Sequence, residues 1–141
     1  MILPDVNVLV NAFRADTVRH EVCRGWLTTV VNSPARFGMS PQVLASVVRV
    51  TTHPKVFRTP STVREALRFC QGLLEAPQCV AVTPGNQHWG IFSRLCVQAS
   101  AKGNLVSDAW LAALAIEAGC DWITLDADYR RFPGLSFREP A

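Results

Sequence analysis

Four aspartates stand in apolar stretches of this sequence, where a charge is not needed for solubility: Asp5, Asp108, Asp126 and Asp128. Carboxylates that are crowded together repel one another, and each costs stability unless it is protonated or bound to a cation. Mg²⁺ and Mn²⁺ are hard cations that take one or two carboxylates and fill their other positions with water and phosphate. The pattern therefore predicts a divalent-metal site for a phosphate-containing substrate.

Each aspartate also has a plain structural interpretation. Asp5 is suited to cap the helix that follows it, and Asp108 to the first turn of another helix. The Asp126-Ala127-Asp128 segment is typical of a solvated turn. These alternatives stay open residue by residue, and only a shared location of the four carboxylates favours a functional site.

The elements that must position these side chains alternate between strands and helices. We expect strands at residues 2–3, 36–39, 78–83, 121–125 and 135–138. We expect helices at residues 6–13, 17–31, 41–50, 63–75, 86–100 and 107–118, a loop at 101–105, and a turn or short helix at 126–132. Three helix starts carry local signals: Asp5, Ser40 before Pro41, and a capping box of Thr62 and Glu65.

This alternation predicts an α/β fold of three layers, with a central, mainly parallel sheet of four to five strands and helices on both faces. In such sheets ligands bind at the carboxyl ends of the strands. Asp5 follows the first strand, and Asp126 and Asp128 follow the fourth. Asp108 is expected to open a helix, where backbone N–H groups stabilise an anion. Distant segments thus deliver carboxylates to one edge.

Length and composition indicate what kind of protein carries this site. The 141 residues are 49% apolar and 18% charged, which indicates a single domain over residues 1–141 with one core. No apolar run approaches the roughly 20 residues that span a bilayer, and the N-terminus lacks the basic lead of a signal peptide, so we expect a cytoplasmic protein. Five cysteines without a CxxC pair predict free thiols.

The net charge of +3 rises when the four aspartates are set aside, which favours a protein that attracts a polyanion. Arginines that could line a nucleic-acid path, or simply be solvated, are Arg14, Arg19, Arg24, Arg49, Arg58, Arg64, Arg68, Arg130 and Arg131.

Other chemistries find less support. The three histidines are too far apart for a local metal motif, and no GxSxG, GxGxxG or P-loop pattern occurs. An aspartyl-phosphate enzyme or receiver domain needs a helper lysine at a strand end. The only lysines, Lys55 and Lys102, follow no clear strand.

Three segments together resemble the PIN-domain ribonucleases, and in order, length and spacing the VapC-type toxins of type II toxin–antitoxin systems. The segments are ILPDVNVL at residues 2–9, GNLVSDA with LAALA at 103–115, and TLDADYRRF at 124–132. The resemblance covers essentially the whole chain and implies a PIN fold, dependence on Mg²⁺ or Mn²⁺, and endonucleolytic cleavage of RNA. It also implies an antitoxin that blocks the site, and commonly a homodimer.

Carried over by motif, Asp5 and Asp108 are expected to be direct metal ligands. Asp126 is expected to complete the cluster directly or through water, and Asp128 to be a second-shell or second-metal partner. Asn7 and Thr124 are expected to orient these carboxylates. The inferred reaction is in-line attack by a metal-activated water, which leaves 5′-phosphate and 3′-hydroxyl ends.

One position departs from the family pattern. PIN domains usually carry an acid in the helix that here reads VLASVVR at residues 43–49, and Ser46 aligns with it. A serine can hold a metal-bound water but supplies no charge, so a second metal should bind more weakly than the first. Single-metal catalysis, preference for Mn²⁺ and reduced activity all remain open. The alternative function is a PIN-like module that binds RNA or a partner without cutting.

Overall fold

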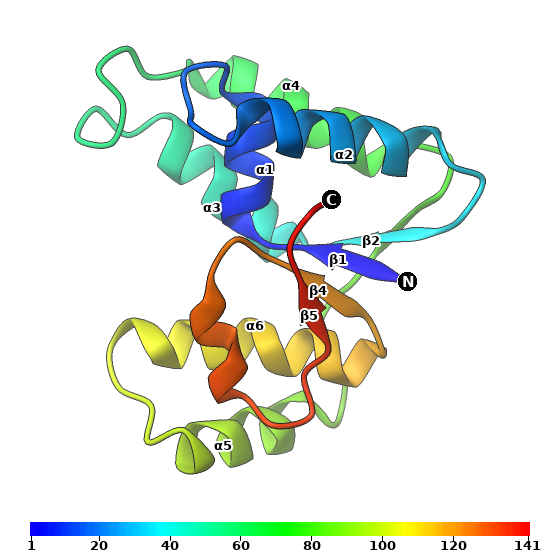
Figure 1. Ribbon diagram of the computed structural model, residues 1–141, viewed down its shortest axis with the longest axis vertical. Helices are drawn as coiled ribbons and strands as arrows, with labels where there is room; N and C mark the ends of the chain where they lie inside the picture. The colour runs from blue at the N-terminus through cyan, green and yellow to red at the C-terminus, as the bar shows by residue number, and fades with distance from the viewer.

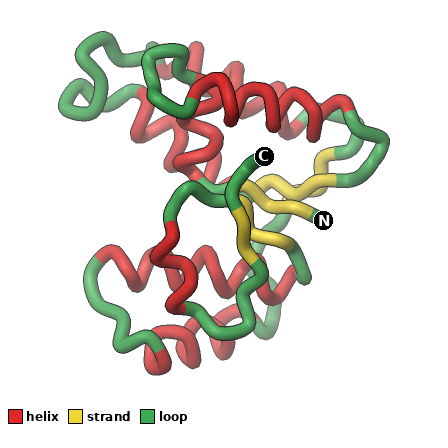
Figure 2. The backbone as a smooth tube through the Cα atoms, in the orientation of Figure 1, coloured by secondary structure: helices red, strands yellow, loops and turns green.

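Five short strands lie in the middle of the molecule, as the computed structural model of residues 1–141 shows (Figure 2). They are β1 (Ile2–Pro4), β2 (Phe37–Met39), β3 (Cys79–Ala81), β4 (Asp121–Ile123) and β5 (Phe137–Arg138). The helices are α1 (Val6–Phe13), α2 (His20–Asn32), α3 (Pro41–Thr51), α4 (Val63–Leu74), α5 (His88–Gln98) and α6 (Asn104–Ala118), with a short 3-10 helix, η1 (Ala127–Arg131).

The helices form two layers with the strands between them, as predicted. Figure 1 shows α1 to α4 on one side of the strands and α5 and α6 on the other. Small side chains let α6 approach the core closely, because Ala109, Ala112, Ala113 and Ala115 are fully buried. No helix is both long enough and apolar enough to span a membrane.

Hydrogen bonds divide the strands into two groups. One sheet has the order β1-β4-β5 and the other pairs β2 with β3, and every pairing is parallel. The two groups meet where β2 lies beside β1. A Cβ on Gly38 would lie 3.2 Å from the carbonyl oxygen of Ile2 and 2.9 Å from Val82 Cγ2. The predicted α/β architecture is confirmed, with its sheet split at this point.

The predicted helix starts are confirmed where a side chain caps the helix. Asp5 caps α1, Ser40 caps α3 with proline in its first turn, and Thr62 and Glu65 form both halves of the capping box of α4. The five cysteines are free, and Cys23, Cys70 and Cys120 among them are buried.

The start of α6 differs from the prediction. The helix begins at Asn104, inside the segment expected to be a loop, because Gly103 takes a positive φ of 59° and turns the chain into the helix at that point. Asp108 therefore lies in the second turn of α6 and does not open it, so the expected stabilisation by free N–H groups of the first turn was wrong. Helix α2 likewise begins at His20 rather than near Thr17.

Candidate active site

A cleft of about 670 Å³ collects side chains from the β1–α1 junction, α3, the first half of α6 and the segment after β4. Asp5, Asp108 and Asp126 line it together. Asp128, by contrast, is exposed and is not among the residues that line the cleft. The structure thus brings three of the four predicted aspartates to one place, from opposite ends of the sequence.

Asp5 is both a helix cap and a lining residue of the cleft. Its Oδ1 accepts a hydrogen bond from the backbone N–H of Val6 at 2.7 Å. Its Oδ2 accepts one from the hydroxyl of Thr124 at 2.7 Å, and the side chain is only 5% exposed. The predicted cap is therefore confirmed, and the same side chain also lines the cleft, so capping α1 does not remove Asp5 from the candidate site.

The hydroxyl of buried Thr124 connects three segments. While it donates to Asp5, it accepts from Nδ2 of Asn7 at 3.4 Å and from the backbone N–H of Asp126 at 3.0 Å. The Oδ1 of Asn7 in turn accepts from the backbone N–H of Leu125 at 3.2 Å. This network fixes the end of β4 against the start of α1, so it holds Asp5 and Asp126 in a defined relation.

The turn after β4 also has a structural purpose. Oδ1 of Asp126 accepts from the backbone N–H of Asp128 at 2.8 Å and so caps η1. Asp126 nevertheless lines the cleft, while Asp128 points its charge toward water. A solvated turn is thus an accurate description of Asp128, and a partial one of Asp126.

Asp108 has a partner that the sequence reasoning missed. The hydroxyl of Tyr129 donates to Asp108 Oδ1 at 3.4 Å from a position in the core, where the ring is 1% exposed. Burial raises the pKa of Tyr129 strongly, and the nearby carboxylates raise it further, so the phenol keeps its proton. The available signal was that the only tyrosine of the chain follows the two aspartates of the third motif.

The carboxylates affect one another electrostatically. Burial and, to a smaller extent, the charges of Asp108 and Asp126 raise the pKa of Asp5 to about 6, against the lowering effect of its hydrogen bonds from Thr124 and Val6. Burial also raises the pKa of Asp108, together with the charges of Asp126 and Asp128. The cleft therefore holds more negative charge than its surroundings neutralise.

The donor chemistry of this cleft fits a divalent cation. No three Asp, Glu, His or Cys side chains are gathered closely enough to hold a metal ion by themselves. Mg²⁺ does not need such a set, because it keeps several waters and commonly uses one or two carboxylates together with substrate phosphate. The carboxyl groups of Asp5 and Asp108, whose pKa values are raised mainly by burial and also by neighbouring negative charge, supply hard oxygen ligands suited to that mode of binding.

The wall formed by α3 carries no acid. Ser46, the residue expected to stand in place of the family's acid, lines the cleft, and Arg49 follows on the same helix face. On the α6 side, Asn104 and Ser107 add polar groups. In the sequence Arg49 is only one of many arginines. That its side chain lines the cleft could not be predicted, because this depends on how α3 packs.

Comparison with known proteins agrees with this geometry. Residues 2–135 match the PIN domain family. The chain is 39% identical over 140 residues to VapC ribonuclease Mb2897 of Mycobacterium bovis, covering 99% of this chain and 95% of the relative. It is 34% identical to ribonuclease VapC25 of Mycobacterium tuberculosis, covering 99% of both chains.

Solved structures share the fold at lower identity. VapBC2 from Rickettsia felis, bound to a DNA fragment from its promoter, superposes with a TM-score of 0.69 at 16% identity, over 99% of this chain and 98% of that one. VapC20 of Mycobacterium tuberculosis, described as a sarcin–ricin loop cleaving toxin, gives a TM-score of 0.67 at 16% identity, over 96% and 98%.

Proposed function

From the premise that this chain belongs to the VapC family of PIN-domain ribonucleases, we propose that it is an Mg²⁺- or Mn²⁺-dependent endoribonuclease and the toxin of a toxin–antitoxin pair. The observation that carries the metal dependence is the convergence of Asp5, Asp108 and Asp126 on one cleft. The proposed products carry 5′-phosphate and 3′-hydroxyl ends.

Asp5 and Asp108 would hold the metal, with Asp126 contributing directly or through water. When bound, the cation would supply a water of lowered pKa and stabilise charge on the leaving oxygen. Thr124 keeps one oxygen of Asp5 engaged at 2.7 Å, which fixes the direction of the carboxylate. The phenol of Tyr129 does the same for one oxygen of Asp108. Hydrogen bonds of this kind to ligating carboxylates are a regular feature of metal sites.

The experiment that tests this function is cleavage of total cellular RNA by purified, antitoxin-free protein in Mg²⁺, in Mn²⁺ and in EDTA. An Asp108→Asn variant, which keeps the shape of the side chain and an acceptor for Tyr129, serves as the matched control. We expect discrete cuts that need metal and disappear in the variant. Intact RNA in every reaction, from protein shown to be folded, would contradict the proposal.

A second candidate function is a module that binds RNA or a partner without cutting, and the observation that favours it is Ser46 in place of an acid. The effect of Ser46 on metal binding is measurable by calorimetry. We expect one tight Mn²⁺ site and one weaker site in the wild type, and a tighter second site in Ser46→Glu. Two comparably tight sites in the wild type would refute the idea that Ser46 weakens the second one.

We further propose a cognate antitoxin that blocks the cleft, assembly as a homodimer and action in the cytoplasm. Structures with the same fold include toxin–antitoxin complexes such as VapBC2 of Rickettsia felis. The five free thiols fit a reducing compartment. Adding the co-expressed antitoxin to the cleavage reaction should abolish the cuts, and light scattering of the isolated chain would give its oligomeric state.

A further inference from the structure

The cleft has an uneven charge distribution. Three carboxylates line one side, and the α3 side contributes Ser46 and Arg49. Among the residues that line the cleft, Arg49 is the only one with a positive charge. A polyanion that approaches three carboxylates is repelled by them, so a cation at the rim has a direct effect on whether it can enter.

The guanidinium of Arg49 is not engaged by the protein. The chain contains two ion pairs, Arg14 with Asp16 and Arg19 with Glu139, and Arg49 belongs to neither. Arg49 is exposed, and no hydrogen bond involves its side chain.

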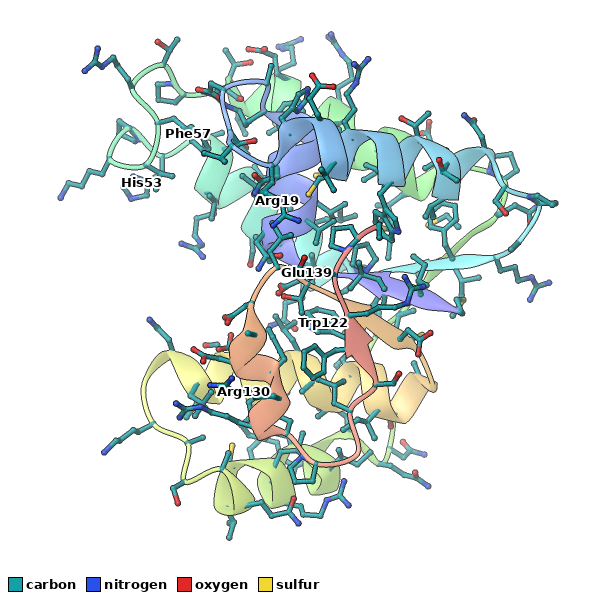
Figure 3. The ribbon with its side chains drawn as sticks, in the orientation of Figure 1. Arg19, His53, Phe57, Trp122, Arg130 and Glu139 are labelled. Carbon is teal, nitrogen blue, oxygen red and sulfur yellow. The ribbon has the colours of Figure 1, made fainter.

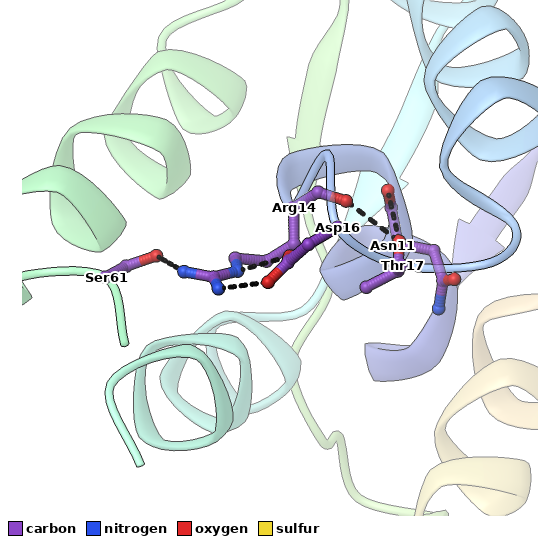
Figure 4. Close-up of polar contacts among 5 residues, drawn as sticks. All are labelled: Asn11, Arg14, Asp16, Thr17 and Ser61. Atoms are coloured by element: carbon purple, nitrogen blue, oxygen red, sulfur yellow. Dashed lines mark hydrogen bonds and ion pairs between the residues drawn. The ribbon is translucent and has the colours of Figure 1, made fainter. Parts of the chain in front are cut away.

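Arg14 differs from Arg49, because its guanidinium is held by hydrogen bonds within the protein. Its Nε and Nη2 donate to the two oxygens of Asp16 at 2.9 and 2.6 Å, and its Nη1 donates to Ser61 at 3.0 Å (Figure 4). Its guanidinium also lies 4.1 Å from the ring centroid of Phe57. All three guanidinium nitrogens of Arg14 donate to protein groups, whereas no such bond engages Arg49, which is exposed and lines the cleft.

We propose that Arg49 is a substrate-binding residue that holds a backbone phosphate of RNA at the rim of the carboxylate cleft; this rests on the proposed ribonuclease function. Guanidinium presents a planar fork of N–H donors that matches two phosphate oxygens. Asn104 and Ser107, across the cleft on α6, add uncharged donors that suit the adjoining sugar-phosphate backbone. The contact is with phosphate, so it contributes affinity without sequence preference.

The binding test needs no knowledge of the RNA target. In the Asp108→Asn background, anisotropy of two unrelated labelled single-stranded RNA oligonucleotides is measured against salt. We expect Arg49→Ala to bind both oligonucleotides about tenfold more weakly. The negative slope of the logarithm of the association constant against the logarithm of salt concentration should become less steep by about 0.7, the value for one phosphate contact. Arg49→Lys should keep the slope and lose only part of the affinity. Arg94→Ala is the charge-matched control and should change neither, because Arg94 is an exposed arginine of α5 that does not line the cleft.

Steady-state cleavage separates this inference from the proposed function. If the wild type cuts, we expect Arg49→Ala to raise KM about tenfold with kcat changed much less, and Mn²⁺ affinity by calorimetry to stay unchanged. Cutting with an unaltered KM and an unaltered salt slope would overturn the role of Arg49 alone. Absence of cutting together with Arg49-dependent RNA binding would overturn the nuclease and support the phosphate contact.

Discussion

The carboxylate of Asp5 accepts two hydrogen bonds and still carries a raised pKa, because burial and the charges of Asp108 and Asp126 outweigh those bonds. A group in this situation weakens the metal-free protein whenever it is ionised. Bound cation would remove the conflict, so the same residue that destabilises the apo form would favour the loaded one.

This makes the stability of the metal-free protein depend on pH. The pKa of Asp5 rises from 3.8 to about 6 on folding, so its favourable contribution is complete below about pH 4 and is lost as the pH rises through 6. The shift corresponds to at most about 3 kcal/mol. Urea unfolding in EDTA should show wild type losing stability relative to Asp5→Asn between pH 4.5 and 7.5. A difference between the two proteins that does not change with pH would contradict this.

Thr124 allows a sharper test of the hydrogen-bond network. Thr124→Val keeps the shape but leaves Asp5 Oδ2 and the N–H of Asp126 without their buried partner. We expect a loss of about 2 kcal/mol in the free energy of unfolding, typical of an unsatisfied buried group, and a large loss of cleavage. Thr124→Ser keeps the hydroxyl and should retain most of both. Equal behaviour of the two variants would show that the hydroxyl does not matter.

The helix starts that could be predicted from the sequence are those where a nearby side chain caps the helix. Asp5, Ser40 and the Thr62–Glu65 pair mark helix starts because a side chain supplies the missing hydrogen bond. The start of α6 escaped prediction because glycine and asparagine at 103 and 104 favour a loop, whereas here Gly103 precedes the helix with a positive φ. The split of the sheet depends on tertiary packing, which no local pattern records.

The contact between the two strand groups depends on Gly38. A methyl group there would lie 3.2 Å from the carbonyl oxygen of Ile2 and from Leu3 Cδ1, both in β1, and 2.9 Å from Val82 Cγ2 after β3, so β1 and β2 would have to separate. We expect Gly38→Ala to cost about 1–3 kcal/mol of stability, as overpacking does. Gly72→Ala in α4 is the matched control, since it meets no atom within 4 Å and should stabilise by up to about 1 kcal/mol. Thermal unfolding measures both, and a neutral Gly38→Ala would contradict the close approach.

Glu117 connects α6 to the segment before α5. Its two carboxylate oxygens accept from the backbone N–H groups of Gly85 at 2.7 Å and Gln87 at 2.9 Å. These bonds lower the pKa of Glu117, so its stabilising effect is present above its unfolded pKa and is lost as the pH falls through the lower folded value. Glu117→Gln should therefore be less stable than wild type at pH 7, with the gap closing toward pH 3. A gap that stays constant with pH would exclude this carboxylate contribution.

The two ends of the chain meet in the folded molecule. β1 pairs with β4, and Arg19 reaches Glu139 at 3.4 Å, both of which Figure 3 labels beside the C-terminal segment. The convergence of Asp5 and Asp126 was predictable, because both follow strands of one parallel sheet. The direction of Arg49 and the partner of Asp108 were not, since they depend on how helices pack against that sheet.

The pairing of β1 with β4 has a consequence for the order of events during protein synthesis. Thr124, the hydrogen-bond partner of Asp5, leaves the ribosome 119 residues after it. β4 is also the central strand of its sheet, so β1 has no strand of that sheet to pair with until β4 has been synthesised. A nascent chain therefore carries the carboxylate of Asp5 without those of Asp108 and Asp126 until these two residues have been synthesised. The cleft can be assembled only after Tyr129, its last lining residue, has been synthesised, and translation products that end before this residue lack it.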